Sequence, residues 1–230
     1  MPTDKWVASL TGARGELTRE STVSRVASVL RDRITAGVLR PGTQVAEQAV
    51  AQALGVSRNT LREAFRLLTD ERLLVHEPHR GVFVRTLSER DVVEIYAARR
   101  IVECAAVRDS GPAGATAVRA VGAAVTAGQR AAIRGRWVDV ASADLRFHRA
   151  LTGLAGSRHL DDLMDLVLAE LRLAFHALPD RRRFHEPYLE RNDEIAALLE
   201  RGRRADAARA LIAYLDDAER QVLAAFPAAG

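Results

Sequence analysis

The sequence predicts a mainly α protein in which three helices and a small β-hairpin are followed by an all-α antiparallel helical bundle. Two observations carry this prediction: apolar residues recur at helical spacing along most of the chain, and only 5% of the residues are aromatic. The 230 residues are enough for one large or two small domains with buried cores. A hydrophobic content of 48% excludes a mainly disordered protein.

The N-terminal third is expected to fold as one domain, residues 21–86, after a flexible arm over residues 1–20. Its first helix should begin near Ser21 or Thr22, because apolar residues then follow one helical face. These residues are Val23, Val26, Ala27, Leu30 and Ile34. Two more helices and two strands are expected over 46–54, 58–70, 73–77 and 82–85, with residues 78–81 as the hairpin tip.

The rest of the chain, residues 87–230, has a helical pattern to its end and forms the second expected domain. Helices are expected near 88–109, 113–133, 136–153, 158–177, 187–201 and 204–225. Glycine and proline mark the breaks between them. The short connections predict antiparallel neighbours in a bundle.

Positive charge is concentrated in the N-terminal domain. Residues 1–86 hold 13 Lys and Arg against 9 Asp and Glu, whereas residues 87–230 hold 21 of each. A basic small domain attached to a neutral larger one is typical of a nucleic-acid reader with a second module. No run of 18 apolar residues or signal-peptide pattern is present, and the single cysteine, Cys104, excludes an internal disulfide, so we expect a cytoplasmic protein.

The third helix combines a basic face with an apolar one, since residues four apart lie on the same side. The basic residues are Arg58, Arg62 and Arg66, and the apolar ones opposite are Leu61, Phe65 and Leu68. Helix, helix, turn, helix and hairpin is the order of a winged helix-turn-helix, whose third helix enters the major groove. The alternative is an ordinary amphipathic helix with solvated arginines. The DNA-binding candidates are Ser57, Arg58, Asn59, Thr60, Arg62, Arg66, His79, Arg80 and Gly81.

Residues 37–84 resemble the GntR family of bacterial regulators along their whole length. The matching elements are Gly37 with Arg40-Pro41-Gly42, then Gly55-Val56-Ser57-Arg58, Leu61-Arg62-Glu63-Ala64 and Pro78-His79-Arg80-Gly81. The resemblance implies that Arg58 and Arg62 contact DNA and that the Arg80-Gly81 tip reaches the adjacent minor groove. Gln48 stands where some members have an arginine contact, and Arg72 stands where many have glycine.

The helical domain that follows the DNA-binding domain resembles that of the FadR branch of the family. In that branch an FCD-type domain binds a small effector and forms a homodimer. Many members hold a divalent metal through an aspartate and three histidines. Asp144 and His148 match the first two ligands at i, i+4, but Asn192 and Tyr214 stand where the other histidines are expected. We therefore expect no tight Zn²⁺ or Ni²⁺ site, and treat Asp144 and His148 as weak metal candidates that more readily form a hydrogen-bonded pair. His185 could approach from a neighbouring loop.

A polar effector pocket inside the bundle is the expected use of these residues. Its candidate members are Arg99, Glu103, Asp144, His148, Asn192 and Tyr214. An arginine there favours a carboxylate-bearing metabolite. The alternative is that Arg99 and Glu103 form only a surface helix pair. The run Arg181-Arg182-Arg183 is interpreted as a solvated loop.

The sequence thus favours a ligand-responsive DNA-binding transcriptional regulator, more often a repressor, that binds a palindromic operator as a homodimer. One alternative is a metal-sensing regulator of the same fold. A second is an architectural DNA binder without effector. The third, a metal-dependent hydrolase built on Asp144 and His148, lacks a complete metal triad, a phosphate loop or a nucleophile elbow.

Overall fold

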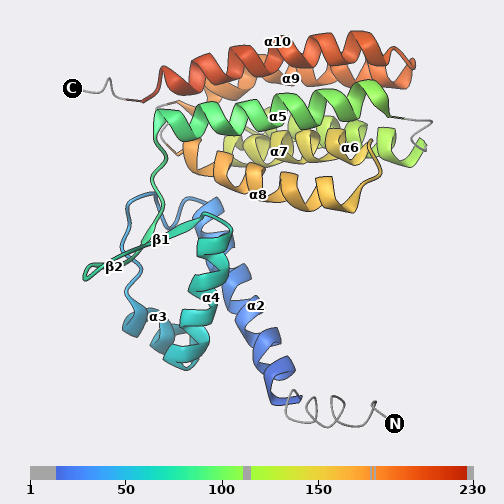
Figure 1. The fold of residues 1–230 in the computed structure, drawn as a ribbon. Helices are drawn as coiled ribbons and strands as arrows, with labels where there is room; N and C mark the ends of the chain where they lie inside the picture. Colours follow the sequence, from blue (N-terminus) through green and yellow to red (C-terminus); the bar gives the residue numbers. More distant parts are fainter. Residues whose placement is uncertain (1–13, 111–114, 177, 179, 227–230) are drawn as a thin grey trace, which may run out of the picture. The chain divides into compact units, whose positions relative to one another are not determined.

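The computed structural model describes residues 14–110, 115–176, 178 and 180–226 of the chain. It divides the chain into two compact units, Met1–Thr86 and Leu87–Gly230. Each unit is described by itself, and Figure 1 gives the labels of the elements. The mainly α fold with a small hairpin confirms the predicted class.

Over its described residues, 14–86, the first unit contains three helices and one hairpin (Figure 1). Its elements are α2 (Arg14–Thr35), α3 (Glu47–Leu54), α4 (Arg58–Asp70), β1 (Leu74–Glu77) and β2 (Gly81–Val84). The two strands are antiparallel, with Leu74 opposite Val84 and Glu77 opposite Gly81. This is the order of a winged helix-turn-helix, with the hairpin as the wing.

A segment before α3 pairs with the wing. Gly42 N–H donates to Val84 O at 2.8 Å, and Val45 N–H donates to Val82 O at 2.8 Å. The same segment forms an isolated antiparallel bridge between Gln44 and Phe83. The outer edge of β2 is therefore paired instead of open, which anchors the wing to the segment that leads into α3.

The core of the first unit is formed by the apolar faces that the sequence spacing predicted. Its members include Val23, Val26, Ala27, Leu30, Ile34, Leu61, Phe65 and Leu68, each less than 9% exposed. Beside this core, Arg31 on α2 donates through Nε and Nη2 to both carboxylate oxygens of Glu71, at 2.7 and 2.6 Å. Since Glu71 is the C-cap of α4, this ion pair joins the end of the third helix to the first.

The second unit is an all-α bundle (Figure 1). Its helices are α5 (Glu89–Asp109), α6 (Ala115–Ile133), α7 (Trp137–Gly153), α8 (Arg158–Ala174), α9 (Arg181–Glu200) and α10 (Arg204–Leu223). Helix α10 packs on α5 and α9, and α7 packs on α6, α8 and α9. Within the described residues, none of the helices combines the length and the hydropathy needed to cross a bilayer.

Two predicted helix starts are wrong. Helix α2 begins at Arg14 instead of near Ser21, so part of the expected arm is helical. Helix α9 begins at Arg181 instead of 187, because the side chain of Asp180 accepts a hydrogen bond from Arg183 N–H and caps it. Pro187 marked the expected start, but it lies inside the helix, where proline removes one intrahelical hydrogen bond without preventing the fold.

The α4 core provides a test of the packing in the first unit. We expect Leu61→Ala to lower the free energy of unfolding by about 2–5 kcal/mol, because Leu61 is fully buried and its removal leaves a cavity. The measurement is urea denaturation followed by circular dichroism. The matched control is Leu67→Ala on the same helix, where the side chain is 38% exposed. Equal losses from both variants would contradict the described orientation of α4.

Candidate functional sites

The N-terminus of α4 is capped and exposed, as DNA reading by this helix requires. Ser57 Oγ accepts a hydrogen bond from Thr60 N–H at 3.0 Å and lies 2.8 Å from Thr60 Oγ1. Arg58 and Asn59 follow on the exposed surface. The sequence therefore places two side chains that can read bases immediately after a helix start that can bind phosphate.

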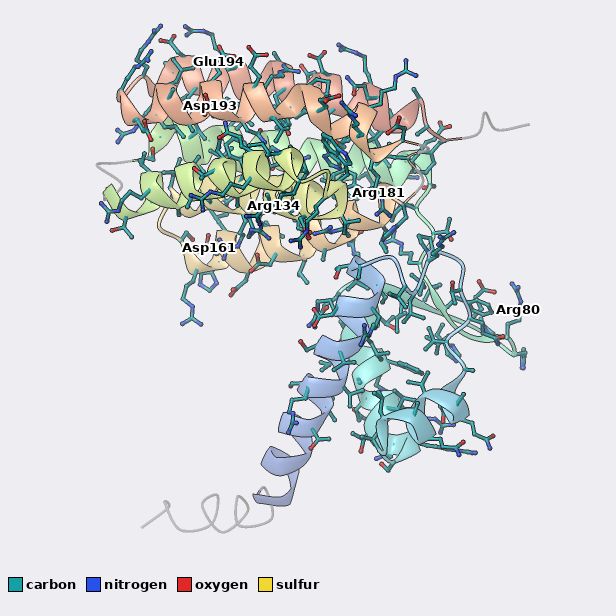
Figure 2. The ribbon with its side chains drawn as sticks, turned by 180° about the vertical axis from the view of Figure 1, so that it is seen from behind. Arg80, Arg134, Asp161, Arg181, Asp193 and Glu194 are labelled. Carbon is teal, nitrogen blue, oxygen red and sulfur yellow. The ribbon has the colours of Figure 1, made fainter. Side chains whose placement is uncertain are left out.

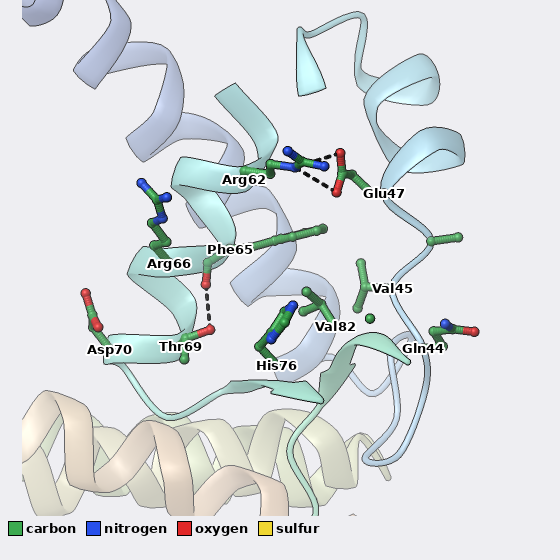
Figure 3. Close-up of a pocket in the computed structure, with 12 residues that line it drawn as sticks. Gln44, Val45, Glu47, Arg62, Phe65, Arg66, Thr69, Asp70, His76 and Val82 are labelled. Carbon is green, nitrogen blue, oxygen red and sulfur yellow. Dashed lines mark hydrogen bonds and ion pairs between the residues drawn. The ribbon is translucent and has the colours of Figure 1, made fainter. Parts of the chain in front are cut away.

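Two arginines of α4 are held by carboxylates on the exposed surface. Arg62 Nε lies 3.0 Å from both carboxylate oxygens of Glu47, the first residue of α3 (Figure 3). Arg66 Nη1 donates to Glu63 at 2.7 Å. Among the described residues, Glu47 binds Arg62 through Nε, which leaves the two terminal nitrogens of the guanidinium for a bidentate contact with guanine.

The wing tip carries Arg80 on a turn whose neighbouring residues have positive φ angles. His79 and Gly81 have φ of 62° and 106°, the left-handed region in which glycine is at ease and histidine is uncommon. Arg80 between them forms an ion pair with Glu77 and lies over the ring of Phe83, 5.2 Å from its centroid. Figure 2 shows Arg80 at the tip of the hairpin. Gln44 Nε2 donates to Arg80 O at 2.6 Å, so the paired segment before α3 supports the tip.

A groove of about 480 Å³ separates α4 from the wing (Figure 3). Arg62, Arg66 and Phe65 line its helix side, and His76 and Val82 line its hairpin side. The groove lies within the first unit. Of the predicted DNA-binding residues, Arg62, Arg66 and Gly81 line this groove, whereas Arg80 lines a separate hollow on the hairpin.

All six residues predicted for the effector pocket are buried in the bundle. They are Arg99, Glu103, Asp144, His148, Asn192 and Tyr214, and none is more than 8% exposed. They come from α5, α7, α9 and α10. The alternative of a surface Arg99–Glu103 pair is wrong, since the two residues are 1% and 0% exposed.

A buried ion pair within α5 is joined to α7 through His148. Arg99 Nε donates to Glu103 Oε1 at 2.7 Å, and the other carboxylate oxygen of Glu103 lies 2.6 Å from His148 Nδ1. Burial by itself would raise the pKa of Glu103, but the charge of Arg99 and the hydrogen bonds from Arg99 and His148 lower it. Glu103 is therefore a carboxylate whose two oxygens are both engaged.

Asp144 is the centre of a second buried cluster. Asn192 Nδ2 and Tyr214 O–H both donate to its Oδ1 at 2.9 Å. His148 Nε2 lies 3.9 Å from Oδ1, and His185 Nδ1 lies 3.9 Å from Oδ2. Burial would raise the pKa of Asp144, but the two histidines and the two hydrogen bonds lower it. Within the described residues, His148 Nε2, both ring nitrogens of His185 and Asn192 Oδ1 are buried without a hydrogen-bond partner.

The space at this cluster is small. A cavity of about 10 Å³ is lined by Asp144, His185 and Asn192 together with apolar residues of α6, α7 and α9. Such a volume holds about one water molecule. A metabolite can enter only if side chains or helices move.

The cluster does not fit the four-ligand metal site that the family resemblance implies. Asn192 and Tyr214 stand at the two remaining positions and donate hydrogen bonds to Asp144, so they stabilise its negative charge without a metal ion. Neutral amide and phenol groups are also weak ligands for Zn²⁺ or Ni²⁺. No group of three His, Cys, Asp or Glu side chains suited to a metal ion occurs in the described part of the chain.

The surroundings of three residues at these sites differ from the sequence prediction or were not predicted. His185 was assigned to a loop because Pro187 was taken as the start of its helix, yet it is 1% exposed and faces Asp144. Glu47 carried no recognisable pattern, since its partner Arg62 is 15 residues away. Arg181, expected in a solvated loop, lies in the first turn of α9 and is partly buried.

Comparison with known families identifies both units. The family model for bacterial regulatory proteins of the gntR family matches residues 22–84, and that of the FCD domain matches residues 94–217, more than half of the chain. The chain belongs to the GntR family. Its first unit is the family's DNA-binding winged helix-turn-helix, and its second unit is an FCD domain.

Relatives in this family support the same assignment. The solved structure of a GntR transcriptional regulator from Rhodococcus sp. RHA1 is 44% identical, with a TM-score of 0.86 over 90% of this chain and 100% of that one. Escherichia coli McbR/YncC shares the fold, with a TM-score of 0.72 at 18% identity, over 87% of this chain and 96% of that one. The gluconate operon transcriptional repressor of Bacillus licheniformis is 39% identical over 38% of this chain. The match spans 35% of that repressor's length.

The buried ion pair provides a test of the bundle interior. We expect Glu103→Gln to lower the free energy of unfolding by about 3–5 kcal/mol, because it leaves the charge of Arg99 buried without its partner. The measurement is urea denaturation. The control is Glu94→Gln on the same helix, where the exposed pair with Arg90 contributes only about 0.3–0.5 kcal/mol. A loss of less than 1 kcal/mol in Glu103→Gln would show that the pair is solvated.

Proposed function

We propose that this protein is a ligand-responsive transcriptional regulator, acting as a cytoplasmic repressor that binds a palindromic operator as a homodimer. The observation that carries the proposal is the exposed basic face of α4 opposite the wing, in a chain whose second unit is an FCD domain. The repressors among its relatives favour the same direction of control. Two copies of the reading head match a two-fold symmetric site.

The proposed DNA contacts divide into three groups. Ser57 and Thr60 at the helix start bind phosphate, whereas Arg58, Asn59, Arg62 and Arg66 face the major groove. His79, Arg80 and Gly81 form the wing tip that enters the minor groove. The support for this division is the exposure of the four arginines and of Ser57, Asn59 and His79, together with the hydrogen bonding of Arg62 to Glu47 through Nε.

The proposed effector is a carboxylate-bearing metabolite that binds in the bundle without a resident metal. Its region includes Arg99, Glu103, Asp144, His148, Asn192 and Tyr214. The unpartnered donors and acceptors there, among them Arg99 Nη2 and Asn192 Oδ1, favour a polar ligand. Such a ligand regulates only if it binds the DNA-competent and incompetent arrangements with different affinity.

The proposed DNA-binding surface of α4 is tested with the double variant Arg58→Ala and Arg62→Ala. We expect its affinity for DNA from upstream of its own gene to fall at least about 30-fold, because two bidentate contacts are lost. Fluorescence anisotropy at fixed salt measures the affinity. The charge-matched control is Arg119→Ala with Arg134→Ala, two exposed residues of the FCD domain. Equal affinity in both double variants would contradict the assignment.

The metal-free pocket is tested by restoring the two family histidines. We expect Asn192→His with Tyr214→His to gain stoichiometric Zn²⁺ or Ni²⁺ binding, since four donors then surround one point. Isothermal titration calorimetry of metal-stripped protein measures it. Adding Asp144→Asn to this double variant should remove the gain. Tight binding of one ion per chain by the unaltered protein would refute the metal-free proposal.

A further inference from the structure

The outward side of α5 carries an isoleucine that none of the other described elements covers. Ile101 is 73% exposed, and among the large apolar side chains of the described residues only Ile133, at the end of α6, is more exposed. The opposite side of α5 belongs to the bundle core, where Val92, Tyr96 and Val107 are each at most 1% exposed. Single exposed isoleucines are common on protein surfaces, so the neighbours of Ile101 decide what this surface can bind.

These neighbours form a pattern that is symmetric about Ile101. Ala97 and Ala105 lie four residues before and after it, and Glu94 and Arg108 lie seven residues before and after it. At about 100° per residue, all five positions fall on the side of α5 that faces away from the core. Neither alanine is buried, and Glu94 and Arg108 are exposed. In either direction the order is therefore charged, small, large, small and charged, with opposite charges at the two ends.

The side of α5 next to this face is already occupied by α10. Arg100 Nη1 lies 3.2 Å from a carboxylate oxygen of Asp216 and 2.5 Å from one of Glu219. The two helices lie side by side in Figure 1. Because these contacts fix α10 beside α5 and leave Ile101 exposed, a partner for the outward face has to come from another molecule.

The charges at the two ends of the face are held only by surface ion pairs. Glu94 pairs with Arg90, and Arg108 pairs with Asp109, and all four side chains are more than 60% exposed. Exposed ion pairs of this kind contribute little to stability. Glu94 and Arg108 can therefore exchange these partners for charges on a docking molecule.

A second copy of the chain has the chemistry that this face requires. When two α5 helices lie antiparallel about a two-fold axis at Ile101, that residue meets its own copy. Ala97 then lies opposite the partner's Ala105, and Glu94 lies opposite the partner's Arg108. Two-fold symmetry repeats each of these contacts once, because a contact between two positions is made in both directions. The small alanine side chains allow the two helices to approach closely.

We propose that this α5 face is an interface on which two copies of the chain pair through antiparallel α5 helices. The face consists of Glu94, Ala97, Ile101, Ala105 and Arg108. The proposal rests on the proposed function, because it names the surface that joins the homodimer. Charge complementarity selects the second copy as the occupant, since the chain itself supplies the opposite charge at each end of its own apolar centre.

The apolar centre is tested by the oligomeric state of the full chain in sedimentation equilibrium. We expect the unaltered protein to be a dimer. Ile101→Glu should raise the dissociation constant of the dimer at least about 100-fold, because each introduced carboxylate meets its own copy across the axis. The matched control is Leu163→Glu on α8, an exposed leucine outside this face, which should dimerise as the unaltered protein does. Circular dichroism checks that each variant is folded.

The charges are tested by exchanging them. Glu94→Arg and Arg108→Glu should each weaken the dimer, because reversal of a charge, unlike its simple removal, places like charges opposite each other at both ends. The double variant with both changes should recover the dimer, since opposite charges then face each other in reversed order. Such recovery is expected only if the two positions meet across the interface.

The proposal is overturned if the unaltered protein is monomeric, or if Ile101→Glu leaves the dissociation constant unchanged. An equal loss in Leu163→Glu, or a double charge variant as weak as the single ones, would overturn it too. DNA affinity is measured in parallel by fluorescence anisotropy. A DNA-binding dimer that survives every variant keeps the proposed function and refutes only this interface. A dimer that responds as expected but binds no DNA supports the interface and refutes the regulator.

Discussion

The buried chain from Arg99 through Glu103 to His148 is the constraint on which the bundle depends. Removing two charges from water is unfavourable, and only close geometry with further hydrogen bonds offsets it. Glu103 provides that geometry, since one oxygen accepts from Arg99 and the other lies 2.6 Å from His148 Nδ1. Helices α5 and α7 must therefore keep one register. The same contact directs His148 Nε2 towards Asp144, which ties the ion pair to the second polar cluster.

Solvent exposure gives the arginines of the two units different roles. In the DNA-binding head, Arg62, Arg66 and Arg80 are paired with glutamates on the surface. Such exposed pairs contribute about 0–1 kcal/mol, so phosphates and bases can replace the glutamates at little cost. In the FCD domain, the pair of Arg99 is shielded from water and stays fixed. Arg172 is the intermediate case, a shielded guanidinium nitrogen that lacks a partner.

Sequence patterns predicted most of the fold because helical spacing, caps and turns are local. Ser57 and Ser88 cap their helices through side-chain hydrogen bonds, in agreement with expected helix starts. The start of α9 was missed for an equally local reason, since the expected start was placed at Pro187 and Asp180 supplies an earlier cap. At the candidate sites, the i, i+4 spacings of Arg99 with Glu103 and of Asp144 with His148 were visible in the sequence. Their burial was not, because either pair could equally have lain on a solvated face.

The sequence by itself determined the GntR-like head, the position of the basic helix face and the replacement of two expected metal ligands by Asn192 and Tyr214. These features depend on residue identity and short spacings, which can be read from the sequence without knowledge of the fold. Only the tertiary structure decided that Asn192 and Tyr214 donate to Asp144, that His185 lies beside it and that Glu47 holds Arg62. Each of these contacts joins residues from different helices. Their geometry is set by helix packing, in which burial and long-range electrostatics act together.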